Sequence, residues 1–100
     1  MRIVWTKFAH EDLKAIRAYI ARDSRYYAVR FTQRIINMAK ALSKFPELGQ
    51  VVPRFGKCVV RERIVQSYRI LYTIENDCVV ILAVVNAARD IESITLPERN

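Results

Sequence analysis

The sequence predicts an α+β domain in which a helical hairpin packs on one face of a twisted, mainly antiparallel sheet, in the order β-α-α-β-β-β. Two consecutive segments of the first half carry apolar residues at helical spacing, whereas the second half contains segments rich in β-branched and aromatic residues. A length of 100 residues with 52% apolar content supports one core but not two. Residues 1–100 are therefore expected to form a single domain.

The first half is predicted to be a strand followed by two helices. Residues 3–5 (IVW) favour a strand, and Thr6 is suited to cap a helix over residues 9–22. A second helix is expected to begin after Ser24 and to end near Lys44, because the following Phe45-Pro46 pair disfavours helical backbone. Each helix has an apolar stripe, formed by Leu13, Ile16 and Ile20 in the first and by Ala28, Phe31, Ile35, Met38 and Leu42 in the second. An antiparallel hairpin lets the two stripes cover each other.

The second half is predicted to be a loop followed by an antiparallel meander. Residues 46–57 contain two of the three prolines and both glycines, which is typical of a loop. Strands are expected over residues 58–65, 68–75 and 78–87, with Asn76-Asp77 as a hairpin turn between the last two. The last strand is apolar on both faces, which predicts a central position with the N-terminal strand available to extend the sheet.

The register of the first meander turn decides where the sheet arginines point. A two-residue turn at Gln66-Ser67 would place Arg61 and Arg63 on the face that the helices cover, where charged side chains are unfavourable. We therefore predict a three-residue turn over residues 65–67, or a bulge. The helix face is then formed by Val60, Ile64, Ile70, Ile74, Val79 and Ile81. The opposite face gathers Arg61, Arg63 and Arg69 around an apolar floor of Leu71, Val80 and Leu82, and an open apolar patch of this kind marks a partner site.

The net charge of +7 lies entirely in the first half of the chain, where residues 1–45 carry ten Lys/Arg against three acidic residues. Such a field favours encounter with nucleic acid or an acidic protein, although it also serves solubility. We predict that the outer faces of the helices form the most positive surface, through Arg17, Arg22, Arg30, Arg34 and Lys40.

No signal peptide and no apolar run of membrane-spanning length is recognisable, which predicts a cytoplasmic protein without membrane contact. Cys58 and Cys78 are isolated, and they are interpreted as free core or sheet thiols. No residues have metal-ligand spacing, and no glycine-rich phosphate loop is present, so neither a metal nor a cofactor is expected.

The segments EDLKAIRAYI, FPELGQ and VRERIVQSYRILYTIENDCVVILAVVNAARDI together resemble the RelE/ParE superfamily of toxins from type II toxin–antitoxin systems. The likeness extends over residues 5–91, and the YRILY strand of residues 68–72 matches a recurrent Tyr-Arg-Ile-x-Tyr strand. The resemblance implies the same order of elements and a role in growth inhibition and plasmid stabilisation. It also implies assembly with a small cognate antitoxin, whose C-terminal part is disordered when free and wraps the helical hairpin and the open sheet.

The superfamily divides by cellular target. RelE-like members cleave mRNA on the ribosome, and the resemblance would then assign catalysis to Arg61, Arg63, Arg69 and Arg89. Several of them carry a Tyr just after the C-terminal Arg, and it is absent here, because residues 90–93 read DIES. ParE-like members poison DNA gyrase and often carry a Leu-His-Gly-x-Arg-Asp segment, similar to residues 85–90, with Asn86 where His is common. We favour the ParE-like branch, with a ribosome-dependent endoribonuclease, or a degenerate toxin that only binds antitoxin, as the alternatives.

The chemistry of RNA cleavage supports this preference. Arginines can hold the phosphorane charge, but their pKa above about 12 makes them poor general bases. His10 is expected in solvent at the start of the first helix, and alternation would point Glu62 away from the arginines. Arg69 has a structural alternative, in which it pairs with Asp90 or Glu75 to hold the C-terminal turn.

Antitoxin binding is expected to use both faces of the molecule. The predicted contacts are Leu71, Val80 and Leu82 on the sheet and Arg30 and Arg34 on the second helix. Tyr26 and Tyr27, beside Arg25 and Arg30, could stack on a partner or on bases, or could simply line the helix packing.

Overall fold

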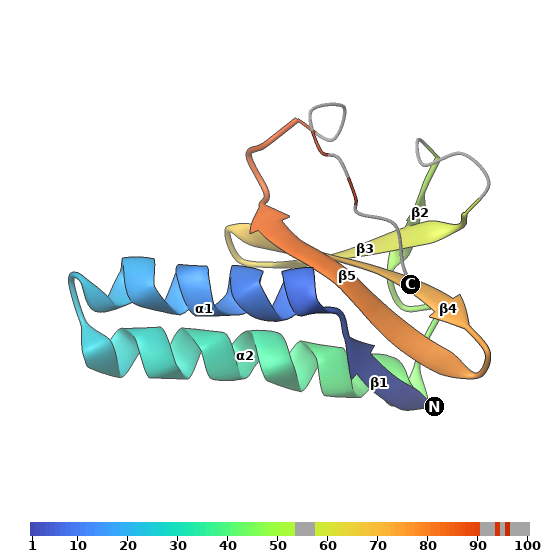
Figure 1. Ribbon diagram of the computed structural model, residues 1–100, viewed down its shortest axis with the longest axis horizontal. Coiled ribbons are helices and arrows are strands. Elements are labelled where there is room, and N and C mark those ends of the chain that lie inside the picture. Colours follow the sequence, from blue (N-terminus) through green and yellow to red (C-terminus); the bar gives the residue numbers. More distant parts are fainter. Residues whose placement is uncertain (54–57, 91–93, 95, 97–100) are drawn as a thin grey trace.

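The computed structural model describes residues 1–53, 58–90, 94 and 96. In chain order the elements are β1 (Arg2–Trp5), α1 (Lys7–Ala21), α2 (Arg25–Lys44), β2 (Gln50–Val52), β3 (Val60–Val65), β4 (Tyr68–Glu75) and β5 (Cys78–Asn86). Figure 1 shows α1 and α2 side by side as one layer and the strands as a twisted second layer. The predicted α+β fold, with its helical hairpin on a sheet, is confirmed.

The five strands form one mixed sheet in the order β1-β5-β4-β3-β2. β1 pairs in parallel with β5, and the other neighbours are antiparallel. The central position predicted for the last strand is confirmed. β2, an edge strand paired with β3, lies within the segment predicted to be a loop.

Both helices begin at a hydroxyl N-cap, which was predicted for Thr6, and the second helix begins after Ser24 as predicted. The hydroxyl of Thr6 accepts a hydrogen bond from the backbone N–H of Ala9 at 3.1 Å, and it donates to the carbonyl of Ile81 at 2.9 Å. Thr6 therefore ends β1, starts α1 and ties both to β5. Ser24 caps α2 in the same way, because its hydroxyl accepts from the N–H of Tyr27 at 3.1 Å.

The predicted register of the β3–β4 hairpin is wrong. Val65 pairs with Tyr68 and Arg63 with Ile70, so the turn contains only Gln66 and Ser67, with Gln66 at a φ of 53°. Arg61 and Arg63 therefore lie on the face that carries the helices, and Arg69 lies on the opposite face.

The sheet tolerates this register because the helices do not cover it evenly. α1 and α2 pack mainly against β5 and β1, so β3 lies at the margin of the covered face. Arg61 and Arg63 are half-buried there instead of being enclosed in the core. Two residues predicted on the helix face move to the other side, where Val60 is buried and Ile64 is exposed.

Each face of the sheet has its own apolar cluster. The larger one joins helices and sheet through residues such as Ile35, Leu42 and Ile81. The second, on the opposite face, consists of Val52, Val60, Leu71, Leu82, Ala83 and Ile94, with Val80, Val85 and Leu96 packed against it. The predicted apolar floor therefore exists, but Ile94 of the chain itself covers it. Leu71 is fully buried and Leu82 is 4% exposed.

Candidate functional site

Arg69, on the face away from the helices, joins three strands at one point. Its Nη1 donates to Oε2 of Glu62 on β3 at 2.9 Å, and its Nη2 donates to the carbonyl of Ala87 after β5 at 2.7 Å. Nε of Arg69 is buried and has no hydrogen-bond partner in the described part of the chain. The predicted structural role named Asp90 or Glu75 as partners of Arg69, and the structure adds Glu62 as a carboxylate in contact with it. Through its hydrogen bond to the Ala87 carbonyl, the Arg69 guanidinium holds the turn that follows β5.

Arg61 and Arg63 lie on the other face, toward the loop that precedes β2. Nη1 of Arg61 donates to the carbonyl of Gly49 at 2.8 Å and, more weakly, to that of Glu47 at 3.4 Å. Nε of Arg63 is buried without a hydrogen-bond partner among the described residues. Arg61 is thus already engaged in holding the segment that the sequence shows as FPELGQ.

The same loop is fastened by the second tyrosine of the YRILY strand. The hydroxyl of Tyr72 accepts from the N–H of Gly49 at 2.8 Å and donates to the carbonyl of Pro46 at 2.7 Å. Burial raises the pKa of Tyr72 above its usual value, so the hydroxyl remains a donor at neutral pH. Gly49 is required by the close approach, because a Cβ there would lie 2.6 Å from the Tyr72 hydroxyl oxygen and 2.7 Å from the carbonyl oxygen of Glu62.

Arg89 lies just beyond β5, in a turn that Asn86 organises. The carbonyl of Asn86 accepts from the N–H of Arg89 at 3.1 Å, and its side-chain Oδ1 accepts from the N–H of Ala88 at 2.9 Å. The Arg89 side chain is exposed, and its charge acts on Asp12 of α1. The four arginines that the resemblance would assign to catalysis are therefore divided between two faces of the sheet and the end of β5.

Asp12 supplies a hydrogen-bond acceptor to β5 beyond the end of its pairing with β1. β1 pairs with β5 only as far as Ile81, so the N–H of Val84 has no strand partner on that side and donates to Oδ2 of Asp12 at 3.0 Å. Desolvation by burial raises the pKa of Asp12, and the charge of Glu11 adds to this rise. The Val84 hydrogen bond and Arg89 act in the opposite direction without cancelling it.

The residues predicted to bind a partner are separated by the fold. Leu71 and Leu82 are buried beneath Ile94, and Val80 is half-buried beside them. The cations predicted on the helices are exposed, namely Arg17, Arg22, Arg30, Arg34 and Lys40. The sheet leucines and the helix arginines therefore do not form one continuous surface, and their part in binding remains a prediction.

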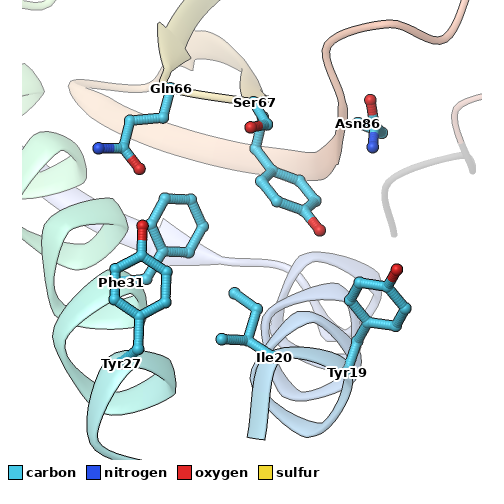
Figure 2. A pocket seen from close by; sticks show the side chains of 8 residues that line it. Tyr19, Ile20, Tyr27, Phe31, Gln66, Ser67 and Asn86 are labelled. Atoms are coloured by element: carbon cyan, nitrogen blue, oxygen red, sulfur yellow. The ribbon is translucent and has the colours of Figure 1, made fainter. Parts of the chain in front are cut away.

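A hollow that the sequence did not reveal opens where the sheet meets the hairpin (Figure 2). Its volume is about 260 Å³, and its lining includes Tyr19, Ile20, Tyr27, Phe31, Tyr68 and Asn86. The sequence did not connect these residues, because the lining comes from α1, α2, β4 and β5 and is assembled by tertiary contacts alone.

No helix in the described ranges is both long and apolar enough to cross a membrane. Within the same ranges, no group of three or more His, Cys, Asp or Glu is arranged to hold a metal ion.

A helical hairpin on a mixed five-stranded sheet is an architecture shared with toxins of toxin–antitoxin systems. The fold is similar to a structure of the chromosomal ParDE system from P. aeruginosa, with a TM-score of 0.72 and 22% identity over 86% of this chain and 95% of that one. It is also similar to a structure of the RelBE2 toxin–antitoxin complex from Mycobacterium tuberculosis, with a TM-score of 0.60 and 24% identity over 85% and 95% of the two chains.

The sequence comparisons identify the family. The family described as the ParE toxin of the type II toxin–antitoxin system parDE matches residues 3–91. Toxin RelE2 of Caulobacter vibrioides is 36% identical over 89 residues, which cover 88% of this chain and 97% of the relative. The chain therefore belongs to the ParE toxin family, within the RelE/ParE superfamily.

Proposed function

We propose that this toxin arrests growth by binding DNA gyrase and that a cognate antitoxin neutralises it. The observation that carries the proposal is the separation of the sheet arginines. Arg61 and Arg63 lie on the helix side, whereas Arg69 lies on the opposite side, bound to Glu62 and to the Ala87 carbonyl. A cationic site for a phosphorane needs its donors to converge on one oxygen cluster, and these donors point to different sides of the sheet.

The known alternative, cleavage of mRNA on the ribosome, also needs a group that removes the proton of a 2′-hydroxyl. His10 lies exposed on the first turns of α1. Glu62, the carboxylate nearest in sequence to the arginines, is occupied by the guanidinium of Arg69 at 2.9 Å. This arrangement supports binding rather than strand cleavage as the toxic activity.

The antitoxin part of the proposal is supported by the relatives. The two similar structures are of a ParDE system and of a RelBE2 toxin–antitoxin complex. The exposed cations of the two helices provide a surface that an acidic partner would recognise.

The test compares the two targets directly with the purified chain. One assay follows supercoiling and DNA cleavage by gyrase, and the other follows cleavage of mRNA on programmed ribosomes. We expect inhibited supercoiling with accumulated cleaved DNA, reversed by the antitoxin, and intact mRNA. Cleaved mRNA together with unaffected gyrase would reject the proposal in favour of the endoribonuclease.

The variant Arg69→Met provides a second test between gyrase binding and mRNA cleavage. If Arg69 is structural, the variant leaves Glu62 and the Ala87 carbonyl without their partner, and the free energy of unfolding should fall by about 2 kcal/mol. Arg34→Met, at an exposed position of α2, is the matched control and should change stability by less than about 0.5 kcal/mol. A catalytic Arg69 predicts the reverse, with stability retained and mRNA cleavage abolished.

A further inference from the structure

The hollow between the hairpin and the sheet has the composition of an anchor pocket. Figure 2 shows Tyr27 and Phe31 from α2 on one side, Tyr19 and Ile20 from α1 on the other, and the Gln66-Ser67 turn above them. Ile20 and the nearly buried Phe31 provide an apolar floor, while the Gln66 and Asn86 amides provide a polar rim. Apolar floors with aromatic walls and a few polar rim groups are typical of sites that receive one side chain of a partner.

The aromatic walls are exposed and yet held in place. Tyr19 is 65% exposed and Tyr27 is 49% exposed, although both are large apolar side chains. The ring of Tyr27 packs against Phe31 with centroids 6.2 Å apart, and Phe31 packs against Tyr68 at 5.5 Å. Rings fixed in this way lose little conformational entropy when a partner covers them, which favours tight binding.

The shape favours a protein side chain over a nucleobase. A base needs two parallel flat faces, or one free face, on which to stack. Here the Tyr27 and Phe31 rings are stacked on each other, with 21° between their planes, and Phe31 and Tyr68 are tilted by 51°. Neither of these two ring pairs leaves room for a base between parallel faces, and we therefore favour an apolar side chain of a peptide as the occupant.

The surroundings of the hollow are basic. The guanidinium of Arg22 lies over the Tyr19 ring at 5.9 Å, and the exposed Arg25 and Arg30 follow on α2. Asp23 is the only acidic residue of the turn between the helices. The partner segment should therefore carry acidic residues on either side of its apolar anchor.

We propose that this hollow receives one apolar side chain from an acidic segment of the antitoxin. The identity of the partner rests on the proposed function, but the position of the site does not. It differs from the sheet floor of Leu71 and Leu82, which Ile94 already covers.

Three aromatic variants of the full chain test the site, with the protein encoded by the adjacent gene of the same operon as the probe. Tyr19→Ala and Tyr27→Ala remove walls of the hollow. Phe8→Ala is the matched control, because Phe8 is 51% exposed on the same helix as Tyr19 and does not line the hollow. Ser67→Phe adds a fourth variant, which fills the hollow without removing a wall. Affinity is measured by calorimetry, and thermal unfolding verifies that each variant is folded.

We expect Tyr19→Ala, Tyr27→Ala and Ser67→Phe each to weaken binding at least tenfold, and Phe8→Ala to change it less than twofold. If the unmodified chain binds the probe and all four variants bind it equally well, the antitoxin part of the proposed function stands and the hollow is rejected as its anchor site. If the unmodified chain does not bind the probe at all, the antitoxin part of the proposed function fails as well. Binding of a single-stranded oligonucleotide that Tyr19→Ala abolishes would overturn the inference in favour of nucleic acid.

Discussion

Replacing Tyr72 with Phe removes a single oxygen atom, yet it should destabilise the whole C-terminal half of the fold. Tyr72 is fully buried, and its hydroxyl makes two of the hydrogen bonds that hold the loop before β2. The ring of the Phe variant fits the same space, so packing is preserved. The N–H of Gly49 and the carbonyl of Pro46, however, keep their positions in the loop and lose their hydrogen-bond partner.

The expected magnitude follows from those partners. The N–H of Gly49 is buried and loses a bond of 2.8 Å, while the carbonyl of Pro46 is half-buried and loses one of 2.7 Å. Each lost hydrogen bond costs about 1 kcal/mol, and an unsatisfied buried N–H costs about 1–3 kcal/mol if water cannot reach it. We expect the free energy of unfolding to fall by about 2–3 kcal/mol. For a domain of this size this lowers Tm by roughly 10 °C.

Urea denaturation at pH 7, followed by circular dichroism, measures the effect. Tyr26→Phe is the control, because the Tyr26 hydroxyl is an exposed acceptor for Arg30 at 3.0 Å and its loss should cost less than about 0.5 kcal/mol. Equal stability of Tyr72→Phe and Tyr26→Phe, with unchanged dependence on urea, would refute the role assigned to the buried hydroxyl.

Two further substitutions test neighbouring features. Gly49→Ala should destabilise the fold by about 2 kcal/mol or more in the same urea assay, since its Cβ would meet Tyr72 and a strand carbonyl within 2.7 Å, and no loss would disprove that close approach. Asp12→Asn keeps an acceptor for Val84 and removes a carboxylate whose pKa burial raises, so stability at pH 7 should be unchanged or slightly higher. The folded state of the wild-type chain binds the Asp12 proton more tightly than the unfolded state, so the wild type gains stability as pH falls through the raised pKa toward 3.8. The free energy of unfolding of the wild type, relative to that of the variant, should therefore increase between pH 7 and 4. A difference independent of pH would contradict this.

The elements that the sequence predicted well are those with local signals. Thr6 caps the first helix and the second helix begins after Ser24, both as predicted, because helix starts depend on residues at most three positions away. The bounds predicted for residues 68–75 agree with β4, because turns flank it on both sides. Asn76 and Asp77 both adopt positive φ, which their short polar side chains tolerate and which a hairpin turn needs.

The register of β3 could not be predicted because it depends on how far the helices extend over the sheet. The rule that charged residues avoid a covered face is sound, but it does not say which strands are covered. Arg61 lies on the helix side at the margin and directs its guanidinium to a backbone carbonyl of the loop. β2 was missed for a related reason, because a three-residue edge strand has almost no periodicity of its own.

The YRILY motif explains why the family was recognisable while the target was not. Each of its five side chains is committed to the fold: Tyr68 packs on Phe31, Arg69 binds Glu62, and Tyr72 holds the loop. Ile70 and Leu71 are fully buried in the clusters on opposite faces. A strand whose side chains all take part in packing or hydrogen bonding within the domain identifies a scaffold, and scaffolds of one family serve different targets. The residues that select a target are therefore to be sought among exposed side chains, whose types the packing of the domain does not dictate.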